Sequence, residues 1–105
     1  MADVIVRRFL EKGRSVRQKI HAVYLFGSRS RGTERPDSDY DLLLVVKKNF
    51  SLSDKDKLYD RVVDVLLETG KLMSLKLFRE EEFQRLSALG TPFIENVLRE
   101  GIKVG

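Results

Sequence analysis

Two aspartates stand at the start of an apolar run in the stretch PDSDYDLLLVV, residues 36–46. Asp39 and Asp41 are two positions apart, so in a strand their side chains share one face and lie about 6 to 7 Å apart. Two carboxylates this close repel each other, and a half-buried pair is best neutralised by cations. Carboxylate oxygens suit Mg²⁺, and ions about 3.5 to 4 Å apart would make a two-metal phosphoryl-transfer site.

Two other interpretations of these aspartates stay open at this point. Asp37, Asp39 and Asp41 can be turn and strand-start residues whose charges face water. They also match the first three ligand positions of an EF-hand calcium loop. That loop next requires a glycine and, at its end, a bidentate glutamate, where this sequence has Leu42 and Lys48.

A phosphate-binding turn is predicted shortly before the aspartates. HAVYLF, residues 21–26, has the β-branched and aromatic content of a buried strand, and it ends at Gly27 and Ser28. Free backbone N–H groups, a glycine without Cβ and a hydroxyl would together favour an anion. The same pair is also common in ordinary tight turns, and Arg29 and Arg31 either face the phosphates or extend into solvent.

The elements that must position these residues follow from periodicity and from capping and breaking residues. A helix is expected over 3–19, with a break or bend at Gly13, and a loop around Pro36 joins the two strands. The remaining expected elements are a strand over 39–46, a helix over about 54–69, a strand over 71–78, a short helix over 79–89 and a last helix from Thr91 to about Glu100, with IKV at 102–104 as an optional fourth strand.

The expected helix over 54–69 has capping signals at both ends and a wide apolar face. Ser53 and Asp56 have capping-box-like spacing, and Gly70 is placed to end the helix. Its apolar residues fall within about half of the helical wheel and are expected to pack on the sheet. They are Leu58, Tyr59, Val62, Val63, Val65, Leu66 and Leu67.

Composition limits the classes of function. A chain of 105 residues is expected to form a single domain, 1–105, with an α/β fold of three or four strands in two or three layers. It has no cysteine and one histidine, which excludes disulfides and thiolate or histidine-rich metal sites. Without a membrane-length apolar run or a signal peptide, a cytoplasmic protein is expected. The +4 net charge suits a phosphate ligand. Direct nucleic-acid binding is not expected, because the sequence lacks a platform of interleaved aromatic and basic residues.

The order and spacing of LFGSRSRG at 25–32 and PDSDYDLLLVV at 36–46 resemble the signature of the minimal nucleotidyltransferases of the DNA polymerase β superfamily. TPFIENVLREGIKV at 91–104 is similar to the C-terminal helix and tail of small prokaryotic members. The resemblance implies a polymerase-β-like α/β core with a mixed sheet. It also implies that Gly27 and Ser28 hold the triphosphate of an NTP, expected to be ATP, while Asp39 and Asp41 ligate Mg²⁺ as the catalytic pair.

Relatives that transfer nucleotides usually carry a third acidic residue on a later strand, and this sequence has no clear match. Asp64 lies off the apolar face of its helix and is expected in solvent. On the strand over 71–78, Ser74 and Lys76 would share a face near the aspartates. Lys76 could partly replace a cation, or extend from a sheet edge into water.

Two hypotheses about function follow. The first is an enzyme that transfers NMP, expected to be AMP, to a hydroxyl of a partner protein or another acceptor. The resemblance suggests that it is the antitoxin of a toxin–antitoxin system with a helical HEPN-type partner. The second is a weak or inactive nucleotide-binding module that acts by covering its partner, because the third acid is missing. The sequence leaves homo-oligomerisation open.

Overall fold

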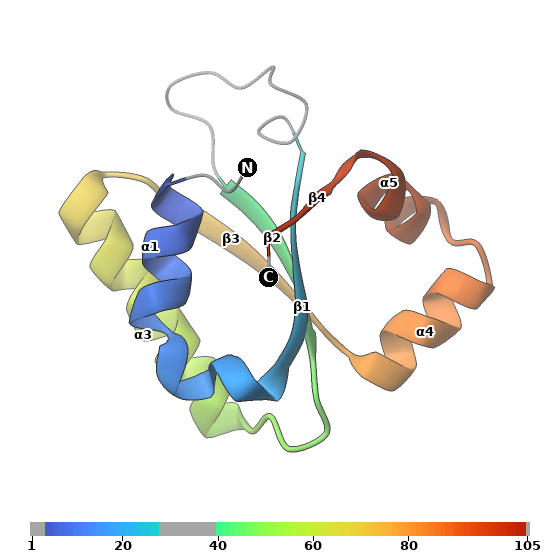
Figure 1. The fold of residues 1–105 in the computed structure, drawn as a ribbon, viewed down its shortest axis with the longest axis horizontal. Coiled ribbons are helices and arrows are strands. Elements are labelled where there is room, and N and C mark those ends of the chain that lie inside the picture. Colours follow the sequence, from blue (N-terminus) through green and yellow to red (C-terminus); the bar gives the residue numbers. More distant parts are fainter. Residues whose placement is uncertain (1–3, 28–39, 105) are drawn as a thin grey trace.

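The chain forms a four-stranded mixed sheet with helices on both faces (Figure 1). The computed structural model describes residues 4–27 and 40–104. In chain order the elements are α1 (Val4–Lys12), the 3₁₀ helix η1 (Arg14–Lys19), β1 (Ile20–Phe26), β2 (Tyr40–Val46), α3 (Leu52–Thr69), β3 (Met73–Arg79), α4 (Glu80–Ala88), α5 (Pro92–Glu100) and β4 (Ile102–Lys103). The predicted α/β fold is confirmed, with the tail as a fourth strand.

The strands are ordered β3-β2-β1-β4 across the sheet. β1 is antiparallel to both β2 and β4, whereas β2 and β3 are parallel and are joined by the crossover helix α3. β2 is therefore an interior strand, and every residue after Asp41 in it is buried. Burial on both faces explains its unbroken apolar run, because neither face needs polar side chains.

Side chains of β2 alternate between two apolar layers, which makes the fold a helix–sheet–helix sandwich. Leu42, Leu44 and Val46 belong to the larger cluster, and Leu43 and Val45 belong to the smaller one. From the helices, the larger cluster takes Val6, Phe9, Val16, Leu58, Val62 and Val65, and the smaller takes Ile94 and Val97 with partly buried Phe83 and Leu86. Thus α1, η1 and α3 cover one face, and α4 and α5 cover the other (Figure 1).

The expected N-terminal helix is interrupted near its middle. α1 ends at Lys12, and a 3₁₀ helix follows Gly13. A Cβ at Gly13 would lie 3.2 Å from Cδ2 of Leu58 on α3, so the chain passes close to that helix at this point. The break predicted at Gly13 is confirmed, and it brings Val16 into the larger cluster.

The N-terminal cap of α3 is not the one predicted from sequence. The N-cap is Ser51, whose Oγ accepts a hydrogen bond from the Asp54 backbone N–H at 3.2 Å, while Asp54 Oδ2 accepts from the Ser51 backbone N–H at 2.9 Å. Lys19 Nζ contacts the same carboxylate at 3.0 Å. The expected pair Ser53 and Asp56 has the same spacing, but only Asp54 is placed beside a lysine from another element. Gly70 ends the helix as expected, with φ +74°.

The predicted apolar face of α3 is only partly buried. Leu58, Val62 and Val65 pack in the core, whereas the other four residues of the predicted set, Tyr59, Val63, Leu66 and Leu67, are exposed. The sheet covers one side of the helix, and the wide apolar arc extends beyond that side. Within residues 4–27 and 40–104, no helix, α3 included, combines the length and the apolar character needed to cross a membrane.

The turn between α4 and α5 also differs in detail from the expectation. Thr91 is the N-cap residue of α5 and Pro92 follows it, as predicted, but no side-chain capping bond is formed. The Thr91 hydroxyl instead donates to the Leu86 carbonyl at 3.1 Å, which ties α5 back to α4. Gly101 follows the helix as expected and leads directly into β4.

We expect Asp54→Asn to weaken the protein in a pH-dependent way. The Ser51 backbone N–H, together with Lys19, lowers the pKa of Asp54 to about 2. A carboxyl whose pKa is lower in the folded state contributes stability above its unfolded pKa of about 4, and that contribution is lost as pH falls toward 2. The difference in free energy of unfolding between wild type and Asp54→Asn should therefore shrink over this window in urea denaturation.

Asp56→Asn is the matched control for this measurement, because Asp56 is an exposed aspartate two residues away on the same helix. Its pH profile should follow that of the wild type. An Asp54→Asn protein whose stability stays at a constant difference from wild type between pH 5 and pH 2 would contradict the assignment.

Candidate active site

Three strand ends meet at one end of the sheet and carry the polar residues of the candidate site. The register of β1 and β2 places Phe26 opposite Asp41, and the register of β2 and β3 places Asp41 beside Ser74. Asp41 therefore lies between the last residue of β1 and the second residue of β3. Its side chain is half-buried, whereas the next five residues of β2 are buried. Within β2, Asp41 is therefore the residue that a polar ligand can reach from solvent.

Gly27 packs directly against the carboxylate of Asp41. Its φ is +77°, in the left-handed region that favours glycine, and an added Cβ would lie 2.6 Å from Asp41 Oδ2. Both the backbone conformation and the lack of space thus require glycine at this position. The turn that the sequence predicts for phosphate and the carboxylate that it predicts for metal are adjacent in the structure.

The carboxylate of Asp41 is on the face of the sheet covered by α4 and α5. Strand alternation puts it on the same side as Leu43, which belongs to the smaller apolar cluster. Ser74 shares this face, so the predicted neighbourhood of Ser74 and Asp41 is confirmed. Lys76 is one step further along, beside Leu43 rather than Asp41, and it is exposed on the edge strand.

A pocket of about 230 Å³ adjoins Gly27 on the same face. Phe26 and Phe93 form one part of it, with an edge-to-face ring contact at 5.5 Å. Asn96 and Glu100 of α5 add polar atoms, and Arg99 donates to Asn96 Oδ1 at 2.6 Å. We did not expect α5 to contribute here. The sequence signal was only the helical spacing of Phe93, Asn96 and Glu100, which puts them on one side of this short helix.

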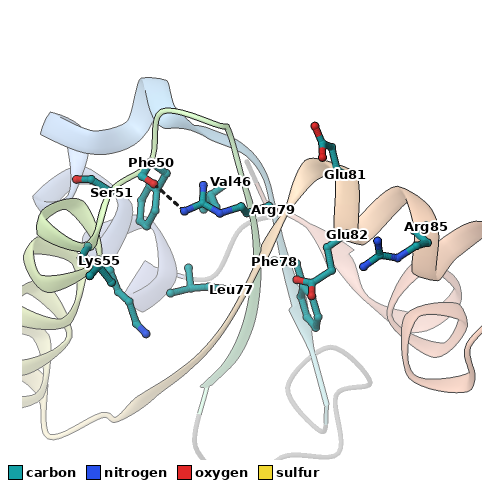
Figure 2. Close-up of a pocket in the computed structure, with 11 residues that line it drawn as sticks. Val46, Phe50, Ser51, Lys55, Leu77, Phe78, Arg79, Glu81, Glu82 and Arg85 are labelled. Atoms are coloured by element: carbon teal, nitrogen blue, oxygen red, sulfur yellow. Dashed lines mark hydrogen bonds between the residues drawn. The ribbon is translucent and has the colours of Figure 1, made fainter.

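Larger pockets lie at the opposite end of the sheet, away from Asp41. One of about 460 Å³ is lined by the ends of β2 and β3 and the first turns of α3 and α4 (Figure 2). Arg79 closes part of it by donating to the Phe50 carbonyl at 3.2 Å. Pocket volume alone would therefore place the site at the opposite end of the sheet from Gly27 and Asp41.

Several residues predicted for the site lie outside the described part of the chain. They are Ser28, Arg29, Arg31, Asp37 and Asp39. Their roles remain predictions, as does the paired-carboxylate arrangement that includes Asp39.

Asp64 is excluded from the site by its position. It is on α3, which covers the face opposite to that of Asp41, and its Oδ2 contacts Arg61 Nε at 3.0 Å. The expectation that it faces solvent is confirmed, since its side chain is 41% exposed. Among the residues that the structure describes, no three His, Cys, Asp or Glu side chains cluster as metal ligands.

The described donors at this site are oxygen atoms, which fit a hard divalent cation. Asp41 supplies a carboxylate, and Ser74 supplies a hydroxyl on the neighbouring strand. No cysteine or histidine is present there to favour a softer metal. The half-buried position of Asp41 also lets a ligand reach it from solvent.

This combination of fold and site matches a known family. The family model described as "Polymerase beta, Nucleotidyltransferase" matches residues 10–104. The chain belongs to the polymerase beta nucleotidyltransferase family. It is a nucleotidyltransferase, and membership implies a nucleoside triphosphate substrate and, in most members, a divalent metal.

Individual relatives agree with this assignment. MJ0604 of Methanocaldococcus jannaschii, named as a candidate protein adenylyltransferase, is 33% identical over 81% of this chain and 78% of its own length. A candidate nucleotidyltransferase of Sulfolobus solfataricus is 26% identical, with a TM-score of 0.50 over 77% of this chain and 69% of its own. A toxin–antitoxin structure with AMP-PNP is 18% identical, with a TM-score of 0.57 over 94% and 68%, and shows the fold alone.

We expect Gly27→Ala to disrupt ligand binding, because its Cβ would displace the Asp41 carboxylate. Gly70→Ala is the matched control. Gly70 has nearly the same φ, +74°, but an added Cβ there meets no atom within 4 Å. Both variants should lose about 1 to 2 kcal/mol of stability from backbone strain. Only Gly27→Ala should lose affinity for Mg²⁺ with a nonhydrolysable ATP analogue, by about tenfold or more in calorimetry. Equal affinities in the two variants would contradict this role of Gly27.

Proposed function

We propose that this nucleotidyltransferase transfers AMP from Mg-ATP to a hydroxyl of a partner protein. The contact between Gly27 and the Asp41 carboxylate is the observation that carries the proposal. It joins a turn suited to phosphate to a carboxylate suited to a cation, as one bound Mg-ATP requires. The name of MJ0604 as a candidate protein adenylyltransferase supports AMP as the group and protein as the acceptor class.

In this proposal the residues of the turn and the strand divide the work. Gly27 and Ser28 hold the triphosphate, with Arg29 and Arg31 beside it, and Asp39 and Asp41 hold Mg²⁺. The bound cations would neutralise charge on the phosphates and orient the α-phosphate for attack.

The reaction forms one P–O bond and breaks another. The acceptor hydroxyl oxygen bonds to the α-phosphorus, and the bond from that phosphorus to the oxygen bridging to the β-phosphate breaks. Pyrophosphate leaves with the electron pair, and the hydroxyl proton passes to solvent. β3 has Ser74 beside Asp41, where a carboxylate could have taken that proton.

We further propose that the partner is a helical HEPN-type toxin in the cytoplasm and that the chain is its antitoxin. The fold likeness to a toxin–antitoxin structure supports this context.

A binding module with little or no turnover is the second candidate, and Ser74 is the observation that favours it. A site with one carboxylate fewer binds its cations less tightly and activates the nucleophile less.

Replacing both Asp39 and Asp41 by alanine is expected to abolish transfer. Wild type, incubated with Mg²⁺, ATP labelled at the α-phosphate and the protein encoded beside it, should label that partner. The double variant should label it at least about 100-fold more slowly, because both predicted metal ligands are gone. Asp64→Ala, an aspartate on the opposite face, should label at the wild-type rate. Labelling by the double variant at that rate would refute the proposal.

Ser74→Asp tests the role of the missing carboxylate. A third acid beside Asp41 would repel it in the metal-free protein, so the melting temperature without metal should fall. The same group adds an oxygen ligand, so the increase in melting temperature on adding Mg²⁺ should exceed that of wild type. Ser74→Ala is the control, and its response to Mg²⁺ should not exceed that of wild type. A Ser74→Asp protein with no added response to Mg²⁺ would contradict the placement of the metal at this position.

A further inference from the structure

β3 has one edge that no strand covers within the described part of the chain. The sheet order β3-β2-β1-β4 places this seven-residue strand at the border. The Tyr40 backbone N–H donates to the Leu72 carbonyl at 2.9 Å. Backbone groups alternate in direction along a strand, so Ser74 and Lys76 direct theirs to β2, and Leu75 and Leu77 direct theirs outward. An edge with outward backbone groups is a template for pairing.

An apolar stripe of α3 runs beside this open edge. Leu52, Tyr59, Val63 and Leu66 are 79%, 40%, 50% and 38% exposed. At 100° per residue they fall within an arc of about 60°, so they form one continuous stripe. We call this stripe and the outer edge of β3 together the α3–β3 surface.

Contacts on either side of α3 fix the direction in which the stripe faces. On one flank, Glu68 forms ion pairs with Arg8 and Lys12 of α1 at 2.8 and 3.0 Å. On the other flank, Leu52 lines the 460 Å³ pocket together with Leu77 of β3. Figure 2 shows that pocket open between the first turns of α3 and α4, along the end of β3. The stripe therefore faces away from α1 and toward the open strand.

We propose that the α3–β3 surface binds a second copy of this chain about a two-fold axis. The two β3 strands pair antiparallel into one eight-stranded sheet, and the two α3 helices pack through their stripes. A single two-fold rotation can bring β3 onto its own copy and α3 onto its own copy, as a self-complementary interface requires. Each element is about 25 Å long, and a helix contact with a strand pair of that length buries on the order of 800 Å² per partner, as stable dimers do.

Charge at the ends of β3 favours the antiparallel arrangement. Lys71 precedes the strand, and Arg79 ends it with its guanidinium donating to the Phe50 carbonyl at 3.2 Å. The first turn of α4, directly after Arg79, contains Glu80, Glu81 and Glu82. Antiparallel pairing places the acidic first turn of α4 in one copy close to Lys71 of the other. Parallel pairing would place acidic ends together, at a cost in electrostatic repulsion.

Lys76 constrains the register. It is exposed on the edge strand, and two lysines directly opposite each other would repel. With Leu75 on the two-fold axis, Leu75 faces its own copy and Lys76 faces Ser74 of the partner subunit. Lys71 then faces Arg79 of the partner subunit, whose guanidinium is turned to the Phe50 carbonyl of its own chain. Outward-directed backbone groups then pair with outward-directed groups, as an antiparallel ladder requires.

Val63→Lys tests the proposal, with Leu98→Lys as the matched control. Both residues are half-exposed on helices, at 50% and 47%, but Leu98 is on α5, away from this surface. At about 100 µM, wild type and Leu98→Lys should sediment at twice the chain mass of 12.1 kDa. Val63→Lys should sediment as a monomer, with a dissociation constant raised at least about tenfold and an unchanged circular dichroism spectrum.

Amide hydrogen exchange supplies a second readout that only strand pairing would move. The amides of Leu75 and Leu77 should be protected in the wild-type dimer and exchange rapidly in Val63→Lys. A monomeric wild type, a dimer that Val63→Lys leaves intact, or a dimer with unprotected Leu75 and Leu77 amides would each overturn the proposal. The proposal would also be overturned if the chain alone were a monomer and Val63→Lys removed only its binding to a different, helical protein.

Discussion

The antiparallel register of β1 and β2 is the constraint on which the site depends. It sets Phe26 opposite Asp41, and the chain then turns at Gly27 directly over the carboxylate. A shift by one residue would send Asp41 to the other face of the sheet and Leu42 to the site. The buried apolar residues that follow in β2 oppose such a shift, because it would exchange the side chains of both layers.

This constraint explains why so much charge adjoins a core strand. β2 is covered on both faces for most of its length, and only its first residues reach the end of the sheet. On β2 the accessible polar residue is therefore confined to one end, and the mixed topology brings that end next to the ends of β1 and β3. The apolar layers supply the rigidity that holds Asp41 between Gly27 and Ser74, and the strand ends supply the chemistry.

α3 combines two roles that its sequence does not separate. One side packs Leu58, Val62 and Val65 into the core, and the other presents an apolar stripe beside the open edge of β3. The candidate site and this surface share β3, whose inner edge pairs with the strand of Asp41. Assembly through β3 would therefore act on the same strand that positions Ser74.

Local patterns in the sequence predicted most of the elements and indicated the chemistry that we propose for the site. The sequence signals for the elements are short-range: apolar runs, Gly13, Gly70 and the Thr91–Pro92 pair. An apolar run marks a segment to be buried, glycine permits a left-handed backbone, and proline lacks an N–H donor, and each signal is read within a few residues. The glycine turn and the spaced aspartates likewise indicated phosphate and metal, because residue type and local spacing are enough to suggest which ions they bind. The spacing of the aspartates indicated a pair, although Asp39 and Ser28 lie outside the described residues.

Only the tertiary structure decided features that depend on contacts between distant segments. Ser51 rather than Ser53 caps α3, because Lys19 meets Asp54 from another element. Four of the seven residues in the predicted apolar face of α3 are exposed, because sheet order sets which side is covered. Besides the left-handed backbone at Gly27, the lack of space for a Cβ there is likewise tertiary. It comes from the Asp41 carboxylate, which is fourteen residues away in the chain and adjacent only through strand register.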